Sequence, residues 1–124
     1  MTKVGIVIVS HSKWIVQGLV DLISEVAKDI VLTYVGGTED GGIGTSFEQV
    51  QTVVEANKAE KILAFFDLGS ARMNLELVAD FSDKDIIINN VPIVEGAYTA
   101  AALLQAGADL ATIQEQLKEL EIKK

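Results

Sequence analysis

Apolar residues follow two alternating patterns along the chain, and the alternation predicts strands and helices in turn. Unbroken, largely β-branched runs predict four strands, at residues 3–10, 29–36, 61–67 and 85–89. Apolar residues three or four positions apart predict five helices, at residues 12–28, 47–54, 70–80, 95–106 and 110–120. Strands without polar alternation are buried on both faces, so helices are expected to cover both sides of the sheet.

Two of the helices have apolar positions that indicate how they pack. The first expected helix follows Ser12, a residue type that caps helix N-termini. Its apolar residues at helical spacing are Ile15, Leu19, Leu22, Ile23 and Val26. The last expected helix has a narrow apolar seam at residues 110, 113, 117 and 120, which suits packing on the sheet or against a second subunit. After it, only Lys123 and Lys124 are expected to be loose.

Strands that alternate with helices form βαβ units, in which neighbouring strands run parallel and the crossovers are right-handed. No repeat or linker-like stretch interrupts the pattern, so residues 1–124 are expected to form a single domain. We therefore predict an α/β fold with an open, mainly parallel sheet of four strands in the order 2-1-3-4. In such a sheet ligands bind beyond the carboxyl ends of strands 1 and 3, where the strand order reverses.

The composition narrows the partners and chemistries that this fold can have. Hydrophobic residues make up 49% of the 124 residues, which is too many for a disordered chain. A net charge of −8 disfavours contact with nucleic acids and with anionic membranes. The absence of cysteine excludes disulfides, thiol catalysis and cysteine-bound zinc. The sequence shows neither a run long enough to span a bilayer nor a signal-peptide pattern, so a cytoplasmic protein is expected.

The single histidine follows the first expected strand, and an aspartate ends the third. His11 and Asp67 are therefore expected to be neighbours at the point where the strand order reverses. A neutral histidine is a nucleophile, and a carboxylate on its other ring nitrogen fixes the tautomer and supports the developing imidazolium charge. We predict the nucleophilic role for His11 and the supporting role for Asp67. The alternative is a histidine exposed in a surface loop.

A glycine-rich loop at residues 36–46 leaves the same edge of the sheet. Gly37 lets backbone N–H groups approach a phosphate, and Thr45 or Ser46 starts a helix whose N-terminus favours anions. We predict phosphate contacts for these three residues and for Ser12. The loop lacks the Gly-Lys-Ser/Thr of a Walker A motif, and its acidic residues disfavour a bound nucleotide. The alternative is a flexible surface loop whose last serine caps the next helix.

The segment that begins with the last residue of the third strand, Asp67–Asn74, combines a turn residue with a hydroxyl and a cation. Gly69 permits a tight turn, and Ser70 lies where the next helix starts and can face an anion. We predict phosphate binding for both. Arg72 is the only arginine, and it either neutralises a phosphoryl group or a partner's carboxylate, or lies in solvent.

Two other chemistries have less support. One histidine and scattered carboxylates form no metal-ligand cluster, so no metal is expected. A Ser-His-Asp hydrolase built from Ser10 or Ser12 is conceivable, but a serine adjacent to the histidine points in a different direction. The chain also lacks the G-x-S-x-G elbow of such enzymes.

Four segments in order resemble the phosphotransferase subunit of phosphoenolpyruvate-dependent dihydroxyacetone kinase. They are GIVIVSHS at the first strand, the GG-to-GTS loop, FFDLGSARMN and NNVPIVEGAY, and the resemblance runs from Lys3 to about Leu120. That subunit is similar to the IIA component of mannose-family sugar phosphotransferase systems. The resemblance implies an open α/β domain that forms a homodimer.

The same resemblance implies a phosphocarrier mechanism. His11 would receive a phosphoryl group from the histidine-containing phosphocarrier protein, HPr, with support from Asp67. The group would then pass to ADP held on a separate nucleotide-binding subunit, while a third subunit carries dihydroxyacetone. The chain itself would bind no cofactor, because phosphoenolpyruvate supplies the group through HPr, and ADP and magnesium stay on the partner.

Two further functions remain open from the sequence. The sugar-transporter branch shares the histidine chemistry but usually has a Gly-Gly-Ser-Pro run after the aspartate. Here the run is Leu68-Gly69-Ser70-Ala71-Arg72, which favours the kinase branch. A non-catalytic dimeric regulatory module would use His11 only structurally, and phosphorylation of that residue distinguishes it from both carriers.

Overall fold

The computed structural model describes residues 3–124, which contain four strands and five helices. The strands are β1 (Val4–Ser10), β2 (Val31–Gly36), β3 (Lys61–Phe66) and β4 (Asp85–Asn89). The helices are α1 (Lys13–Val26), α2 (Phe47–Ala56), α3 (Gly69–Phe81), α4 (Ile93–Gln105) and α5 (Leu110–Lys118). Every predicted element is present, with ends that differ by no more than two residues. Within the described residues, no helix combines the length and apolarity needed to cross a bilayer.

The strands form one sheet in the predicted order β2-β1-β3-β4, and all three neighbouring pairs run parallel. The register aligns the carboxyl ends of β1, β2 and β3, because Ser10 pairs with Gly36 and Val9 pairs with Phe66. These ends lie along one edge of the sheet. The edge therefore brings together the residues that follow β1, β2 and β3.

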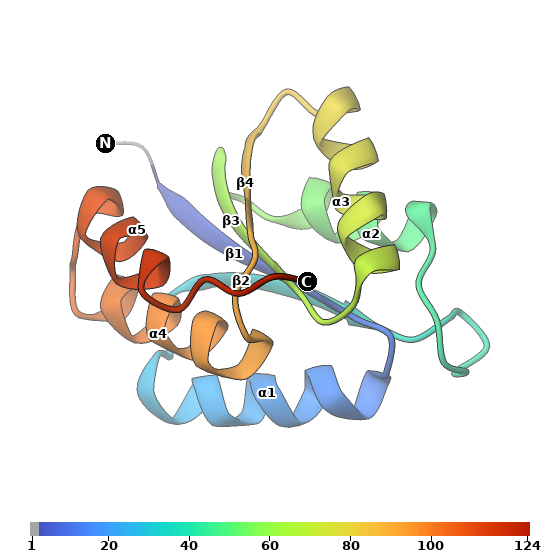
Figure 1. Ribbon diagram of the computed structural model, residues 1–124, viewed down its shortest axis with the longest axis horizontal. Coiled ribbons are helices and arrows are strands. Elements are labelled where there is room, and N and C mark those ends of the chain that lie inside the picture. Colours follow the sequence, from blue (N-terminus) through green and yellow to red (C-terminus); the bar gives the residue numbers. More distant parts are fainter. Residues whose placement is uncertain (1–2) are drawn as a thin grey trace.

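Helices cover both faces of the sheet (Figure 1). The helices α1, α4 and α5 enclose one core around Ile6 and Ile8 of β1, and α2 and α3 enclose the other around Val7 and Val9. Successive residues of a strand face opposite sides of a sheet. Both sides of β1 are buried, which explains why its sequence is an unbroken apolar run.

The buried face of α1 differs in part from the apolar positions that the sequence indicated. The buried residues are Val16, Leu19, Val20 and Ile23. Three positions of the expected set, Ile15, Leu22 and Val26, are between 40% and 52% exposed. Apolar residues occupy two neighbouring arcs of this helix, so their spacing alone does not show which arc faces the sheet.

The last helix and the residues after it both pack on the rest of the chain. Ile113 and Leu117 of α5 are buried in the same core as α4, so α5 covers the sheet. After α5, the N–H of Ile122 donates to the carbonyl oxygen of Asn90 over 2.9 Å. Lys124 Nζ donates to the carbonyl oxygen of Phe66 over 2.5 Å. The expectation of a loose Lys124 is therefore wrong, because an isolated lysine gives no sequence signal for such a tertiary contact.

Candidate active site

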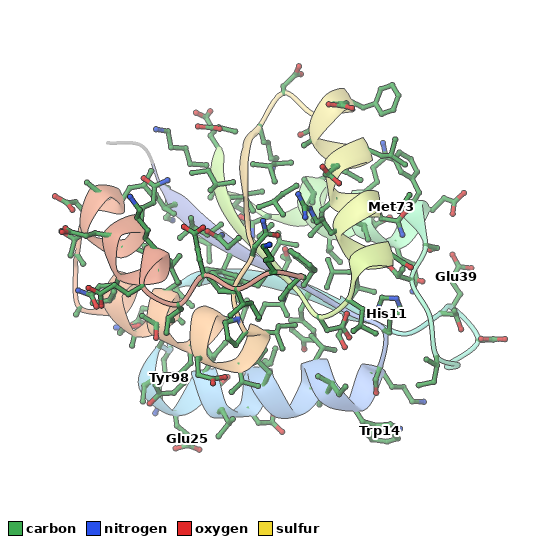
Figure 2. All side chains as sticks on the ribbon, in the orientation of Figure 1. His11, Trp14, Glu25, Glu39, Met73 and Tyr98 are labelled. Atoms are coloured by element: carbon green, nitrogen blue, oxygen red, sulfur yellow. The ribbon has the colours of Figure 1, made fainter. Side chains whose placement is uncertain are left out.

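His11 lies in the short connection between β1 and α1, at the carboxyl edge of the sheet (Figure 2). Two hydrogen bonds from the glycine-rich loop hold this connection. The N–H of Gly37 donates to the carbonyl oxygen of Ser10 over 3.1 Å, and the N–H of Gly44 donates to that of His11 over 2.9 Å. The backbone around His11 is therefore anchored to the loop as well as to its own strand and helix.

Asp67 contacts His11 at two atoms, so the structure brings the two predicted residues together. Its Oδ2 accepts a hydrogen bond from the backbone N–H of His11, and its Oδ1 lies 2.8 Å from His11 Nδ1. Oδ2 also accepts from Ser10 Oγ over 2.8 Å, and Oδ1 accepts from the N–H of Leu68 over 2.7 Å. Four donors from three residues hold the carboxylate in one orientation.

These contacts also favour the ionised form of Asp67 and one tautomer of the neutral His11 ring. Partial burial of Asp67 raises its pKa, but the hydrogen bonds from His11, Ser10 and Leu68 favour the charged form and hold the pKa below its ordinary value. An ionised carboxylate can only accept, so the hydrogen-bond network assigns the imidazole proton to Nδ1. The lone pair of Nε2 is then available for reaction.

Ser10 supports the carboxylate, a role that the sequence-based prediction did not include. Its side chain is buried, and its Oγ donates to Asp67 and accepts from the N–H of Ser12 over 3.1 Å. From the sequence alone, Ser10 is a candidate only for the nucleophile of a Ser-His-Asp hydrolase. A polar residue at the end of a strand that is otherwise buried and apolar is the signal that points to this role.

The N-terminus of α3 lies directly after Asp67. Leu68 occupies the cap position without a side-chain hydrogen bond, and Gly69 and Ser70 form the start of the helix. N–H groups in a first helical turn have no acceptor within the helix, and the helix dipole favours negative charge there. The structure therefore brings Gly69 and Ser70 to the site, and phosphate binding by them stays a prediction.

Two predicted phosphate ligands of the glycine-rich loop already serve the fold. The N–H of Gly37 donates to Ser10, as described above. Ser46 caps α2, because its Oγ accepts from the N–H of Gln49 over 3.3 Å and lies 3.1 Å from Gln49 Oε1. In this arrangement the N–H of Gly37 and the hydroxyl proton of Ser46 are already used.

The two remaining hydroxyl residues keep a proton to donate. Thr45 Oγ1 accepts from Asn74 Nδ2 over 3.2 Å, a contact that joins the loop to α3. Ser12 caps α1, because its Oγ accepts from the N–H of Ile15 over 3.4 Å. Both hydroxyl groups act as acceptors in these contacts and can still donate to an anion. Asn74 was not among the predicted site residues.

Arg72 lies one turn into α3, where its side chain is 39% exposed. Its Nε is 3.8 Å from Oε1 of Glu76, one turn further along the helix. An exposed pair of this kind is weak. The structure thus places Arg72 on the surface of α3, and its role toward a phosphoryl group or a partner's carboxylate stays a prediction.

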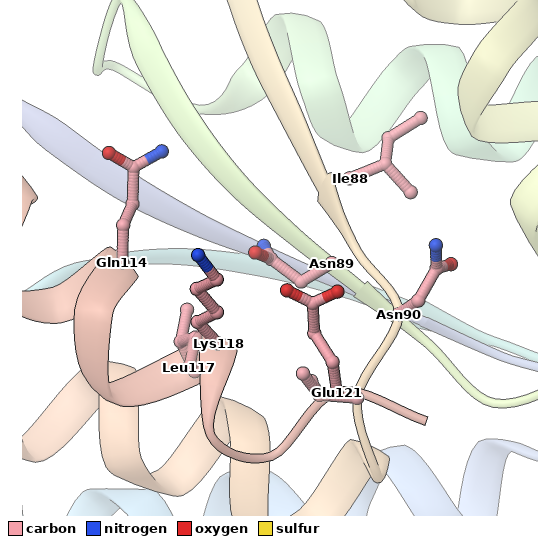
Figure 3. A pocket seen from close by; sticks show the side chains of 8 residues that line it. Ile88, Asn89, Asn90, Gln114, Leu117, Lys118 and Glu121 are labelled. Atoms are coloured by element: carbon pink, nitrogen blue, oxygen red, sulfur yellow. The ribbon is translucent and has the colours of Figure 1, made fainter. Parts of the chain in front are cut away.

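His11 lies at the surface of the protein, and its side chain is partly exposed. The His11 side chain is 16% exposed, and Figure 2 shows Trp14 and Met73 on the same side of the molecule. A pocket of about 240 Å³ lies elsewhere, between the end of β4 and α5, and includes Asn90 and Lys118 (Figure 3). Among residues 3–124, no group of three or more histidine and acidic side chains could hold a metal ion. An accessible nucleophile of this kind suits group transfer between proteins.

Comparisons with known proteins assign the family. The model EIIA-man, described as PTS system fructose IIA component, matches residues 5–114. The phosphotransferase subunit DhaM of PTS-dependent dihydroxyacetone kinase from Lactococcus lactis subsp. lactis (strain IL1403) is 59% identical over 120 residues. The match covers 97% of this chain and 98% of that protein. The chain belongs to the DhaM family. This membership confirms the resemblance, and it assigns the chain to the kinase branch, as a DhaM phosphotransferase subunit of phosphoenolpyruvate-dependent dihydroxyacetone kinase.

One further curated relative carries the same family name, and two solved structures share the fold. The phosphoryl donor subunit DhaM of PEP-dependent dihydroxyacetone kinase 1 from Listeria innocua serovar 6a is 50% identical over 119 residues and 96% of each chain. A crystal structure of a protein of unknown function, EF1359, has a TM-score of 0.84 and 30% identity, and the match covers 98% of this chain and 97% of that one. A sigma-54 interaction domain protein from Enterococcus faecalis, at 14% identity and a TM-score of 0.75, shows the fold alone. The predicted α/β fold is thus shared by solved structures.

Proposed function

We propose that this DhaM-family chain is a phosphocarrier that takes a phosphoryl group from phosphorylated HPr onto Nε2 of His11 and passes it to ADP. The ADP is held by the nucleotide-binding subunit of dihydroxyacetone kinase. One observation carries the proposal: Asp67 Oδ1 lies 2.8 Å from His11 Nδ1, which leaves Nε2 as the free nucleophilic nitrogen. The relatives named as phosphoryl donor subunits support the same direction of transfer.

Each transfer forms one bond to phosphorus and breaks another. The Nε2 lone pair of His11 attacks the phosphorus of phospho-HPr, a bond forms between Nε2 and phosphorus, and the donor's nitrogen–phosphorus bond breaks. The His11 ring then carries positive charge, which the carboxylate of Asp67 stabilises through Nδ1–H. In the second step a terminal phosphate oxygen of ADP attacks, and His11 leaves as the neutral imidazole. Phosphoryl transfer of this kind depends mainly on positioning and on donors to the phosphoryl oxygens.

The donors for those oxygens come from several elements around His11. Ser12 and Thr45 offer hydroxyl groups, and the first turn of α3, with Gly69 and Ser70, offers backbone N–H groups. Arg72 contributes charge or a contact to the protein partner. Gly37 and Ser46 act by holding the loop and α2 in place.

The chain holds no cofactor of its own in this scheme. Phosphoenolpyruvate supplies the phosphoryl group through HPr, and ADP and magnesium stay on the nucleotide-binding subunit. We place the reaction in the cytoplasm, and we propose that the chain acts as a homodimer, as the family resemblance implies.

The test is intact mass after incubation with phosphoenolpyruvate, enzyme I and HPr. The wild-type chain should gain one acid-labile phosphoryl group, and the His11→Ala variant should gain none. The charged chain should then discharge to the ADP-bound kinase subunit. Discharge to a transporter IIB domain instead would move the chain to the sugar-transporter branch.

A different outcome would reject the carrier function altogether. If HPr becomes phosphorylated but the wild-type chain gains no mass, then His11 is not a phosphoryl acceptor. The non-catalytic regulatory module would then be the better interpretation. Circular dichroism of the His11→Ala variant is the control that its fold is intact.

A further inference from the structure

Residues 119–124, which follow α5, run along the carboxyl edge of the sheet toward the connection between β3 and α3 (Figure 1). The contact of Ile122 N–H with the Asn90 carbonyl, 2.9 Å long, fixes the middle of this segment just beyond β4. Lys124 then lies at the end of β3. Its Nζ contacts the Phe66 carbonyl and is 4.0 Å from the centroid of the Phe66 ring. The segment thereby places a cation at the active-site edge of the sheet.

The local structure explains why an ammonium group fits at this point. The last pair between β3 and β4 joins Phe65 to Asn89, and Phe66 lies one residue beyond it. The Phe66 carbonyl therefore follows the end of the β3–β4 pairing, where a side-chain donor can take the place of a strand. A lysine has three donors, so the contact with this carbonyl leaves N–H groups for other acceptors.

The residue that follows Phe66 is Asp67, the carboxylate that holds His11. Burial lowers the pKa of Lys124, and the negative charge of Asp67 raises it by less. The cation of Lys124 is thus within the electrostatic reach of the pair that Asp67 forms with His11.

Such a cation matters because phosphorylation adds negative charge to an acidic protein. The chain already has a net charge of −8, and a phosphoryl group on His11 would lie close to the ionised Asp67. Of the other charged side chains near this edge, Arg72 pairs with Glu76, and Lys13 Nζ lies 5.1 Å from the Trp14 ring. Glu39 and Asp40 of the glycine-rich loop add negative charge, which cannot offset that of a phosphoryl group.

We propose that Lys124 is a positioning residue of the phosphoryl-transfer site, whose ammonium group offsets the charge of Asp67 and so stabilises the phosphorylated state of His11. The effect on phosphorylated His11 rests on the proposed phosphocarrier function, and the effect on the charge of Asp67 does not. Lys124 does not touch the reacting atoms. It acts through Asp67: the ammonium reduces the repulsion between that carboxylate and the phosphoryl group, while the hydrogen bond from His11 Nδ1–H to Asp67 Oδ1 still supports the charge on the ring.

Three variants separate the charge of Lys124 from its hydrogen bond. Lys124→Gln keeps a donor and removes the charge, Lys124→Arg keeps both, and Lys123→Gln removes a charge from the adjacent residue as the matched control. The first measurement needs no phosphorylation: the titration of the Asp67 carboxyl carbon by ¹³C NMR in the isolated chain. The second is the equilibrium distribution of the phosphoryl group between HPr and the chain.

We expect Lys124→Gln to titrate Asp67 at higher pH, by roughly 0.2 to 0.7 of a unit, because the carboxylate loses a nearby cation. The same variant should shift the phosphoryl distribution toward HPr by about two- to fivefold. Lys124→Arg and Lys123→Gln should match the wild type in both measurements. The shift should shrink in 1 M salt, because salt screens an exposed charge.

Two results would overturn the inference. An Asp67 titration in Lys124→Gln that coincides with the wild type would show that the ammonium does not act on the carboxylate. A shifted titration with an unchanged phosphoryl distribution would show that the charge does not bear on transfer. If the wild-type chain accepts no phosphoryl group at all, the proposed function fails by itself, and the titration still decides whether Lys124 offsets Asp67.

Discussion

Asp67 holds His11 through both carboxylate oxygens: Oδ2 accepts from the backbone N–H and Oδ1 faces Nδ1, each at 2.8 Å. Asp67, which follows β3, thus fixes both the backbone and the ring of His11, which follows β1. The contact with the backbone N–H fixes the position of the His11 main chain, and the contact with Nδ1 fixes the orientation of the imidazole ring. Nε2 is consequently directed away from Asp67, and the carboxylate remains in place to support positive charge on the ring.

The first prediction concerns the Asp67→Asn variant and its dependence on pH. The pKa of Asp67 is lower in the folded chain than in the unfolded chain, so its contribution to stability is present above the unfolded value, about 3.9, and is lost as the pH falls through the folded value. An asparagine at this position does not titrate, so its contribution to stability does not change with pH. We expect the variant to unfold about 1–3 kcal/mol more easily at pH 7, because an amide donor would face the donors that now bind Oδ2.

Urea unfolding at several pH values measures this difference, which should narrow as the pH falls below about 4. Transfer from phospho-HPr at pH 7 should be roughly 10- to 1,000-fold slower in the variant, because support for the imidazolium ring is weakened. A gap in stability that stays constant from pH 7 to pH 3 would contradict the ionised Asp67. An unaltered transfer rate would remove Asp67 from the mechanism.

Most of the arrangement that brings these two residues together could be predicted from the sequence. Unbroken apolar runs identify the buried strands, and alternation with helices dictates parallel pairing. The order of strands then follows from a common rule, and it makes the residues after β1 and β3 neighbours. His11 and Asp67 are therefore predictable as a pair, because their positions depend on topology and not on side-chain detail.

Contacts that depend on side-chain detail could not be predicted in this way. The spacing of apolar residues does not show that Val16 of α1 is buried while Ile15 is about half exposed. It also does not show that the N–H of Gly37 is used by the fold, or that Lys124 reaches β3. Each of these depends on how a loop or a helix end lies in three dimensions, which residue types at regular spacing do not encode.

The second prediction concerns Trp14, on the first turn of α1 and three residues after His11. Its side chain is 75% exposed, and a large aromatic group on the surface beside a reactive residue suits contact with a protein partner. We expect Trp14→Ala to lower kcat/KM for transfer from phospho-HPr by roughly 10- to 30-fold. The rate of phosphorylation by a small donor, phosphoramidate, should not change, because the chemistry at Nε2 is untouched.

Tyr98→Ala is the matched control for this prediction. Tyr98 is an exposed aromatic residue on α4, and Figure 2 shows it well away from His11. This variant should transfer phosphoryl groups from both donors at the wild-type rate. Equal losses with HPr and phosphoramidate in Trp14→Ala would show that Trp14 shapes the site itself, and no loss with either would exclude it from the docking surface.

The third prediction compares two glycines that differ in what surrounds them. A Cβ on Gly36, at the end of β2, would lie 2.5 Å from the Ser12 carbonyl oxygen and 2.8 Å from the Cα of Lys13. Gly36→Ala must therefore push the start of α1 away from the sheet, and it should destabilise the fold by about 1–3 kcal/mol. The displaced segment is the one that follows His11, so phosphoryl transfer should slow as well.

Gly18, in the middle of α1, provides the opposite case. A Cβ there would meet nothing within 4 Å, and alanine favours a helix interior more than glycine does. Gly18→Ala should therefore raise the free energy of unfolding by up to about 1 kcal/mol and leave transfer unchanged. Urea unfolding and the HPr assay check both variants. If Gly36→Ala proves as stable and active as the wild type, the close approach of β2 to the start of α1 is not what positions His11, and the contact with Asp67 must hold it alone.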